Sequence, residues 1–271
     1  MTENSADTDG QQHPKLDTTV PQTARIWNYW LGGKDNFAVD RTVGDEIRAA
    51  FPKIVENARL SRAFLVRAVR YLAGEAGIRQ FLDIGTGLPT ADNTHEVAQA
   101  VAPESRIVYV DNDPLVLVHA RALLTSSPQG VTDYIDADMH DPDKILLEAS
   151  RILDLTQPVA VLFMGVLGHI SDDDQARSIV RTLMDAVPSG SYFASYDGTN
   201  TSPEVVIAAD IWNQSANPTY HLRSPEQIAR FFDGLELVEP GVVSVTRWRP
   251  DPSIADAPTE IDQYCGVARR P

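Results

Sequence analysis

Cysteine and long apolar runs are almost absent from this sequence of 271 residues. Cys265 is the single cysteine, so an intrachain disulfide and a zinc site built on several cysteines are both excluded. No apolar run reaches the length of about 20 residues that a membrane-spanning helix needs. Residues 1–5 lack the charged-then-apolar start of a secretion signal. We therefore expect a cytoplasmic protein without a membrane partner.

Positive charge is also scarce. The chain has 23 Lys and Arg against 38 Asp and Glu, which gives a formal net charge of −15. Because binding to a nucleic-acid backbone needs clustered Lys and Arg, we expect no nucleic-acid partner, whereas a cationic ligand suits this charge. The hydrophobic share of 43% is ordinary for a globular protein and allows a sizeable core in one large or two small domains.

The first 78 residues differ in character from the rest. Residues 1–20 are polar and lack hydrophobic periodicity, which predicts a disordered tail. Residues 21–78 form an N-terminal segment in which apolar side chains recur at helical spacing over residues 40–50 and 55–74. The longer helix is expected to bury one face, made of Ala58, Phe64, Leu65, Ala68, Val69 and Leu72.

Strands and helices alternate in residues 79–271. After a first strand that enters Gly85, the pattern predicts strands at 106–111, 131–136, 158–164 and 191–196, separated by helices at 92–101, 114–124, 141–152 and 172–187. This alternation predicts a doubly wound α/β sheet. Two further helices, 203–212 and 224–232, precede strand-like runs at 235–245 and 263–268, which a proline-rich loop at 251–258 joins. These two runs predict an antiparallel hairpin at the end of a parallel sheet.

A glycine turn follows the first strand, in the pattern Asp83-x-Gly85-x-Gly87. The next strand ends in an acidic group that begins at Asp111. Glycine allows a tight turn and a close approach of ligand to backbone, and an acid at the end of the second strand can accept hydrogen bonds from a ribose diol. Because adjacent parallel strands end at one edge, the two features predict a nucleotide-type pocket there.

The acid before the turn distinguishes between nucleotides. A dinucleotide fingerprint requires a third glycine where this chain has Thr90. A buried Asp83 would repel a diphosphate and favour a cationic ligand. The pattern resembles the first motif of class I S-adenosylmethionine-dependent methyltransferases, whose cofactor carries an ammonium, a sulfonium and a ribose but no phosphate.

Three blocks together carry a more specific resemblance. Residues 23–37 combine two tryptophans, a tyrosine and two glycines, and residues 81–95 and 108–114 hold the glycine turn and the acidic strand end. With these blocks the chain, from Thr23 onward, closely resembles a bacterial family of S-adenosyl methyltransferases that was long recorded as a domain of unknown function. The resemblance implies a class I fold of five parallel strands and a terminal antiparallel pair, S-adenosylmethionine as cofactor, and methyl transfer to an acceptor that we expect to be a small molecule.

The resemblance also implies roles for individual residues. Asp83, Gly85 and Gly87 would line the methionine moiety of the cofactor. Asp111 would accept from the ribose hydroxyls, and its neighbour Asn112 would also bind the cofactor. Asp138 would accept from the adenine amino group while Met139 packs on the ring. The chain departs from the commonest first motif at Pro89, which has no N–H to donate. The residues that the resemblance concerns are therefore Asp83, Gly85, Gly87, Pro89, Asp111, Asn112, Asp138 and Met139.

The aromatic block suggests a cover for the pocket. Trp27, Tyr29 and Trp30 precede Gly32-Gly33, which would supply a hinge, and aromatic faces suit a sulfonium. We expect this helical lid to contribute Tyr29 to the cofactor site. Arg25, or alternatively Lys34, would bind the cofactor carboxylate. Ordinary packing of the aromatic side chains in the core is the open alternative.

Few residues in the sequence indicate the catalytic chemistry itself. An in-line displacement at a sulfonium methyl depends mainly on alignment and desolvation, so a base is optional. His169, after the fourth strand, is a candidate general base or a structural histidine. His95 and His140 are interpreted as structural, and we expect no metal site. Two other hypotheses remain: a cofactor-binding regulator or scaffold without turnover, and a nucleotide-dependent oxidoreductase, which Asp83 opposes.

Overall fold

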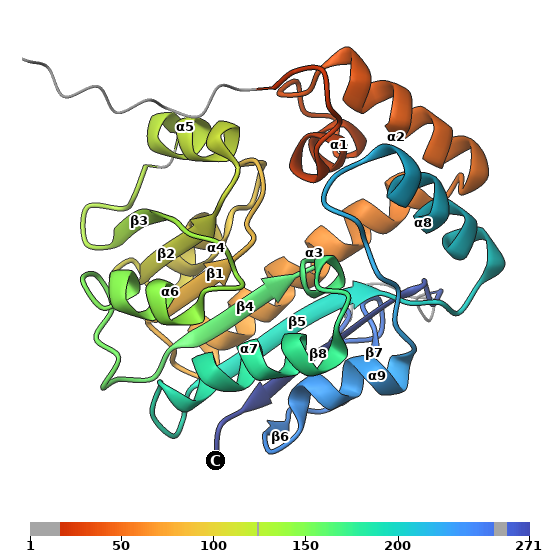
Figure 1. The fold of residues 1–271 in the computed structure, drawn as a ribbon. Helices are drawn as coiled ribbons and strands as arrows, with labels where there is room; N and C mark the ends of the chain where they lie inside the picture. The colour runs from red at the N-terminus through yellow and green to blue at the C-terminus, as the bar shows by residue number, and fades with distance from the viewer. Residues whose placement is uncertain (1–16, 124, 252–258) are drawn as a thin grey trace, which may run out of the picture.

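A single eight-stranded sheet runs through the computed structural model, which describes residues 17–123, 125–251 and 259–271 (Figure 1). The strand order is β3-β2-β1-β4-β5-β8-β6, and β7 also pairs with β8. The first five strands in the chain pair in parallel and β8 joins β5 in the antiparallel sense. The strands are β1 (Gln80–Ile84), β2 (Arg106–Asp111), β3 (Val131–Asp136), β4 (Ala160–Met164), β5 (Tyr192–Gly198), β6 (Glu236–Leu237), β7 (Val243–Ser244) and β8 (Gln263–Arg269).

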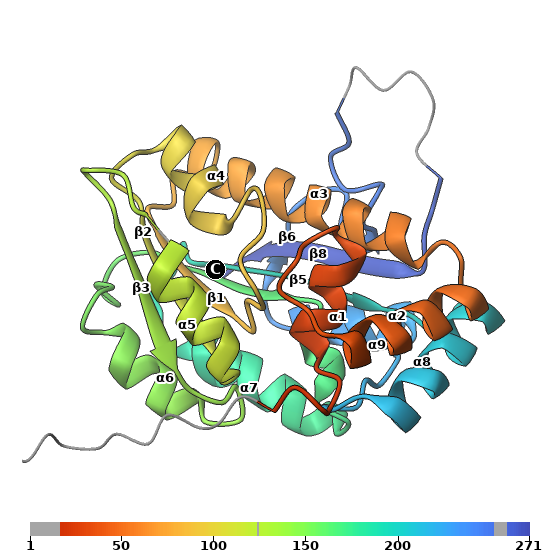
Figure 2. The ribbon, with the colours of Figure 1, turned by 90° about the horizontal axis from the view of Figure 1, so that it is seen from above.

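Helices cover both faces of the sheet, as Figure 2 shows from above. One face carries α3 (Ile54–Gly74) and α4 (Thr94–Val101), whereas the other carries α6 (Pro142–Ala149) and α7 (Asp173–Asp185). The connecting helix α5 (Pro114–Leu123) contacts β3, and α9 (Pro225–Ala229) lies beside the 3-10 turn η2 (Arg230–Phe232). Among the described residues, no helix has both the length and the apolarity needed to cross a membrane.

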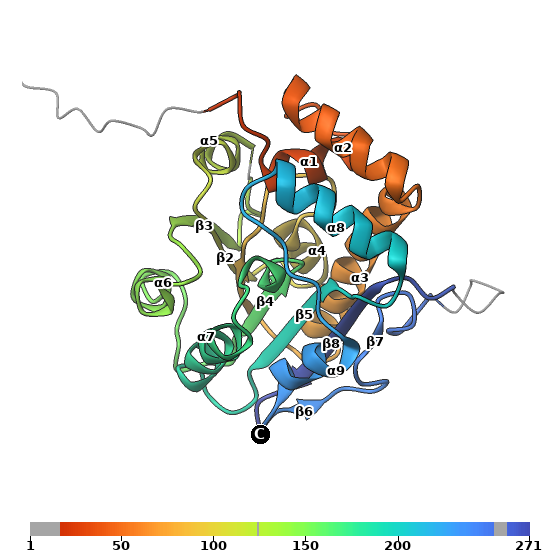
Figure 3. The ribbon, with the colours of Figure 1, turned by 45° about the vertical axis from the view of Figure 1, so that its right-hand side comes forward.

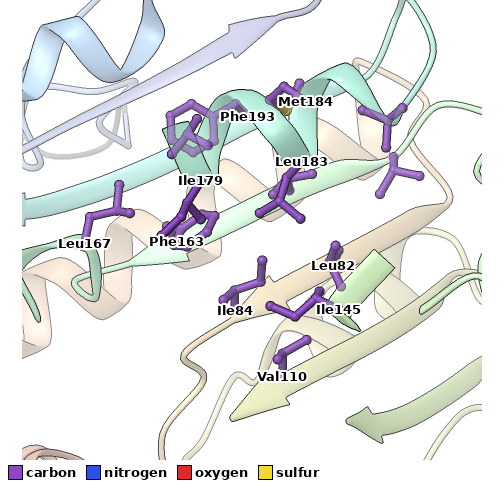
Figure 4. Close-up of a cluster of buried hydrophobic side chains, with 14 of the residues drawn as sticks. Leu82, Ile84, Val110, Ile145, Phe163, Leu167, Ile179, Leu183, Met184 and Phe193 are labelled. Atoms are coloured by element: carbon purple, nitrogen blue, oxygen red, sulfur yellow. The ribbon is translucent and has the colours of Figure 1, made fainter. Parts of the chain in front are cut away.

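Side-chain alternation along the strands builds a core on each face. Leu82 and Ile84 of β1 pack on the α7 side together with Leu183, as Figure 4 shows. Phe81 points to the opposite face, where Phe64 and other apolar residues of α3 cover it. Because the period of a strand is two, Asp83 must share the face of Phe81 and therefore lies on the α3 and α4 side.

A third apolar cluster holds the N-terminal helices together. It joins α1 (Thr23–Trp30), α2 (Ala38–Ala50) and α8 (Pro203–Ser215), which lie side by side above the sheet in Figures 1 and 3. Ile26, Trp30, Ile47 and Trp212 are buried in it. The ring of Trp30 lies 6.1 Å from that of Trp212. This cluster anchors α1 over the carboxyl ends of the parallel strands.

The predicted order of elements is confirmed, with one correction near the end of the chain. The expected strand at 235–245 is instead two short strands, β6 and β7, separated by a turn at Pro240 and Gly241. Pro240 cannot donate to a ladder, and Gly241 has φ +86°. Both pieces pair with β8, which lies between β5 and β6. Residues 1–16 of the tail predicted over residues 1–20, and residues 252–258 of the proline-rich loop, lie outside the described residues. The described end of that segment contacts α1, because Arg25 donates to the carbonyls of Asp17 and Val20.

Candidate active site

A cavity of about 290 Å³ lies at the carboxyl ends of the parallel strands, beneath α1. It receives side chains from the turn after β1, from the ends of β2 and β3, from the segment after β4, and from α1 and α3. The fold thus brings together eight of the ten residues expected at the site: Asp83, Gly85, Gly87, Asp111, Asn112, Asp138, Met139 and His169.

Asp83 is a nearly buried carboxylate in the cavity wall. It is 4% exposed, and the hydroxyl of Thr94 at the start of α4 donates to its Oδ2 over 2.6 Å. Burial raises the pKa of Asp83 to about 6, and the nearby charge of Asp111 adds to the rise, while Arg62 and the Thr94 hydrogen bond oppose it. An ionised Asp83 is therefore unfavourable without a cationic partner, which makes this part of the cavity suited to an ammonium or sulfonium group.

Each of the two positions in the glycine turn requires glycine for a specific structural reason. Gly85 has φ +70°, and a Cβ there would lie 2.3 Å from Cγ2 of Val166 in the segment after β4. Gly87 has φ +64° and directs its N–H to Oδ2 of Asp111, 2.9 Å away. The turn therefore depends on glycine both for its backbone conformation and for its contact with the β4 loop.

Asp111 connects the turn to the end of β2. Its Oδ1 accepts from the backbone N–H of Asp113 over 3.0 Å, while Oδ2 accepts from Gly87. Burial raises the pKa of Asp111 to about 6 against the effect of these hydrogen bonds. A carboxylate oxygen has two lone pairs, so each oxygen keeps capacity for one more donor. The two hydroxyls of a ribose could use this capacity.

Asp138 follows β3 and is already bonded within the protein. Its Oδ1 accepts from the backbone N–H of His140 at 2.9 Å and lies 2.6 Å from the Nδ1 of that residue, and Asn112 donates to Oδ2 over 3.2 Å. Burial opposes ionisation, but the hydrogen bonds from His140 outweigh it and lower the pKa of Asp138. Asp138 is thus an ionised acceptor at neutral pH. In the described part of the chain, no three potential ligands are grouped as a metal site.

Sequence analysis overlooked two contributors to the cavity. Tyr134 of β3 stacks on Tyr109 of β2 at 6.0 Å between ring centroids, and its hydroxyl lies 2.7 Å from Oγ1 of Thr86. Arg62 of α3 also lines the cavity, and its guanidinium donates to the carbonyls of Ala91 and Asp92. Tyr134 also packs against the apolar core on the α3 side of the sheet. The one sequence signal that could have identified Arg62 is the presence of an arginine in the part of α3 that faces the cavity.

Two predicted cofactor contacts require correction, since neither Arg25 nor Tyr29 lines the cavity. Arg25 is buried in an ion pair with Asp40 of α2, with Nε 3.0 Å from Oδ2, and it donates to the carbonyl of Asp17 over 2.9 Å. Tyr29 donates to Oδ1 of Asp45 over 2.8 Å. The cause is the rotation of α1 about its axis. Ala24, Trp27, Asn28 and Leu31, which share a helical face, point to the cavity, so the residues between them point to α2.

The glycine pair after α1 has a packing role. Gly33 donates its N–H to the carbonyl of Asn28 over 2.8 Å, and a Cβ on Gly33 would lie 2.3 Å from Nδ2 of Asn28. Gly32 has φ +83° and ends the helix. Trp30 also donates from Nε1 to the carbonyl of Gly44. These contacts tie the end of α1 to its surroundings, and opening of α1 as a lid stays a prediction.

The order of the sheet, its antiparallel β8 and a cavity at the glycine turn define the class I methyltransferase fold. The mitomycin 7-O-methyltransferase MmcR shares this fold, with a TM-score of 0.51 at 16% identity over 91% of this chain and 68% of that one. Residues 9–271 match the family described as S-adenosyl methyltransferase. The chain belongs to that family.

Two other solved structures are much more similar to this chain. A DUF574 family protein from Streptomyces avermitilis is 46% identical, with 95% of this chain and 100% of that chain covered and a TM-score of 0.90. A candidate methyltransferase from Thermobifida fusca is 41% identical, with coverage of 97% and 99% and a TM-score of 0.87. The comparison with curated proteins found no match. The chain is therefore an S-adenosylmethionine-dependent methyltransferase, as its sequence motifs predicted.

Proposed function

We propose that this enzyme methylates a small molecule that binds beneath α1, beside the carboxyl ends of β4 and β5. The observation that carries this proposal is the cover over the cavity. Gln22, Ala24 and Trp27 form one part of it, and Gln22 also pairs with Asn217, next to Pro218, which lines the cavity as well. The cavity of about 290 Å³ lies at the lower end of the volumes that small ligands occupy, and the segments over it restrict the access of a folded macromolecule.

The residues present fit the cofactor in one orientation. Asp83 and the backbone of the Gly85 turn would bind the cationic methionine end, where burial leaves the carboxylate in need of a positive partner. Asp111 would take the ribose hydroxyls with its remaining lone pairs. Asp138 and Met139, at the end of β3, would contact the adenine. When bound, the cofactor supplies an electrophilic methyl group on a sulfonium.

We assign to Arg62 the role first expected for Arg25, which is to bind the carboxylate of the cofactor. It lines the cavity beside Asp83, and its charge partly offsets the rise that burial causes in the pKa of that carboxyl. Its guanidinium donates to the carbonyls of Ala91 and Asp92 and to the amide oxygen of Asn93. Within the described residues no carboxylate lies within ion-pair distance of it, so its positive charge is available to the carboxylate of the cofactor.

The remaining wall of the cavity suits an acceptor with an apolar body. It is formed by apolar and aromatic side chains from α1, α3, β4 and β5 and from the loops after α1, β4 and α8. These side chains are Trp27, Leu31, Leu65, Met164, Val166, Tyr196 and Pro218. Such a wall excludes water and holds the acceptor by shape, and it places the acceptor near the ends of β4 and β5. Alignment with the reacting methyl group is the main contribution that the protein can make to this displacement.

Transfer of label from methyl-labelled S-adenosylmethionine tests the proposal. A cell extract is separated by dialysis into a small-molecule fraction and a macromolecular fraction, and each is incubated with the enzyme. We expect label in the small-molecule fraction only. The variant Asp111→Asn, which keeps the shape of the side chain but loses its charge, serves as the matched control and should transfer little label. Label confined to protein or nucleic acid would overturn the proposal.

A further inference from the structure

The tautomer of His169 is defined by its surroundings. His169 ends the 3-10 turn η1 (Leu167–His169) after β4, and its Nδ1 lies 2.8 Å from the carbonyl oxygen of Thr219. A carbonyl can only accept, so Nδ1 must carry the proton in this contact. Burial lowers the pKa of His169 and favours the neutral ring. Nε2 is then an unprotonated acceptor, and among the described residues this buried atom has no hydrogen-bond partner.

An unsatisfied buried acceptor costs about 1–3 kcal/mol, so its presence requires an explanation. His169 lines the cavity close to Val166 and Pro218, at the end proposed for the acceptor. A hydroxyl or amine N–H on the acceptor would give Nε2 the donor that the protein does not provide.

The loop that carries Thr219 is held firmly from α8. Asn213 donates from Nδ2 to the carbonyl of Tyr220 over 2.9 Å and accepts from its N–H at 2.7 Å. Trp212 donates from Nε1 to the carbonyl of Pro218 over 3.0 Å. These bonds lie on both sides of Thr219 in the sequence, so they fix the direction of its carbonyl group.

Asp197 of β5 connects the two segments that carry His169 and Thr219, the partners in the Nδ1 hydrogen bond. Its Oδ1 accepts from the backbone N–H of Gly168 over 3.0 Å, next to His169, and from the hydroxyl of Tyr220 over 2.8 Å, next to Thr219. The ring of Tyr220 packs edge-to-face on His169 at 5.0 Å. A Cβ on Gly168 would lie 2.4 Å from that ring, so glycine is required for this packing. One buried carboxylate therefore holds both segments.

We propose that Nε2 of His169 accepts the proton of the methyl acceptor, and that Asp197 and Tyr220 are positioning residues that hold His169 in the required tautomer. The proposal rests on the proposed location of the acceptor. In this step a lone pair of the acceptor oxygen or nitrogen forms the bond to the methyl carbon. The electrons of the carbon–sulfur bond go to sulfur, and the acceptor proton passes to Nε2. The imidazolium then releases that proton to water. The acceptor class is thus a small molecule with a hydroxyl or amine.

The first test reads the tautomer directly and needs no acceptor. Long-range ¹H–¹⁵N spectra of the protein with labelled histidine should show His169 protonated at Nδ1 and bare at Nε2. Tyr220→Phe keeps the ring but loses the hydroxyl bond to Asp197, so it should show a mixture of tautomers. Tyr71→Phe, a matched change on α3 far from His169, should leave the spectrum unchanged. A wild-type ring protonated at Nε2, or a Tyr220→Phe spectrum identical to wild type, would overturn the proposal.

The second test measures single-turnover transfer to whichever extract fraction the wild type labels. His169→Asn retains an N–H donor for Thr219 but has no atom in place of Nε2. We expect transfer to fall about 10²–10⁴-fold, the usual range for loss of a general base, with unchanged cofactor affinity by calorimetry. Tyr220→Phe should fall less and also keep its cofactor affinity. Wild-type transfer by His169→Asn would overturn the role of Nε2. Label in macromolecules would instead refute the small-molecule acceptor and leave the tautomer result standing.

Discussion

Replacing Asp83 by asparagine should stabilise the ligand-free enzyme while it removes cofactor binding. The side chain is 4% exposed, and burial raises its pKa from the ordinary value of 3.8 to about 6. The amide of Asp83→Asn has nearly the same shape and can keep the hydrogen bond from Thr94 through its oxygen. What the substitution removes is the charge, which is unfavourable in the empty cavity and favourable next to a cationic ligand.

The size and the pH dependence of the effect follow from the pKa. Because the folded state holds this proton more tightly than the unfolded chain, stability contributed by Asp83 is lost as the pH rises between about 4 and 6. A rise of about two pKa units corresponds to about 3 kcal/mol of destabilisation at higher pH. Asp83→Asn should therefore be more stable than the wild type by up to about 3 kcal/mol near pH 8 and equally stable below about pH 4. The melting temperature near neutral pH should rise by about 4–10 °C.

Thermal unfolding across this pH range, with and without S-adenosylmethionine, measures both parts of the prediction. Without cofactor the wild type should lose stability between about pH 4 and 6, and the variant should show a flatter profile. With cofactor the order should reverse, because only the wild type is stabilised by binding. A variant that is less stable than the wild type near neutral pH, or that gains as much from the cofactor, would refute the reasoning.

Four further predictions follow from the site and its surroundings. Asp111→Ala should weaken cofactor binding by about 1.5–3 kcal/mol, as measured by calorimetry, because it removes a charged acceptor; normal binding would place the ribose elsewhere. Cofactor affinity of the wild type should rise as the pH increases through about 6, where Asp83 and Asp111 become ionised; a flat profile would exclude these carboxylates. Arg62→Gln should weaken binding of S-adenosylmethionine but not of adenosine, which lacks the carboxylate, and equal losses for both would contradict the assignment. Arg25→Met should lower the free energy of unfolding by about 3–5 kcal/mol, because it leaves Asp40 buried and unpaired; a denaturant titration that shows no loss would contradict this.

Local sequence patterns were sufficient to predict the strands and helices of the sheet and the place of the glycine turn. The alternation of apolar strands and amphipathic helices predicted β2 and β3 at their observed bounds, Arg106–Asp111 and Val131–Asp136. The glycine turn and Asp111 could be placed together from sequence alone, because neighbouring parallel strands end at the same edge. The hydrogen bond from Gly87 to Asp111 is the outcome of that rule. The family also followed from these short motifs.

Only the tertiary structure decided which side chains of the covering segments reach the cavity. Helical periodicity identifies the faces of α1 but not the neighbour that each face meets, so Arg25 was assigned to the cofactor although it pairs with Asp40 of α2. Arg62 was not among the residues expected at the site, although it lines the cavity. The link from Asp197 through Tyr220 to the segment that holds His169 joins residues far apart in the chain. Such contacts depend on the packing of whole elements, and no local pattern in the sequence records them.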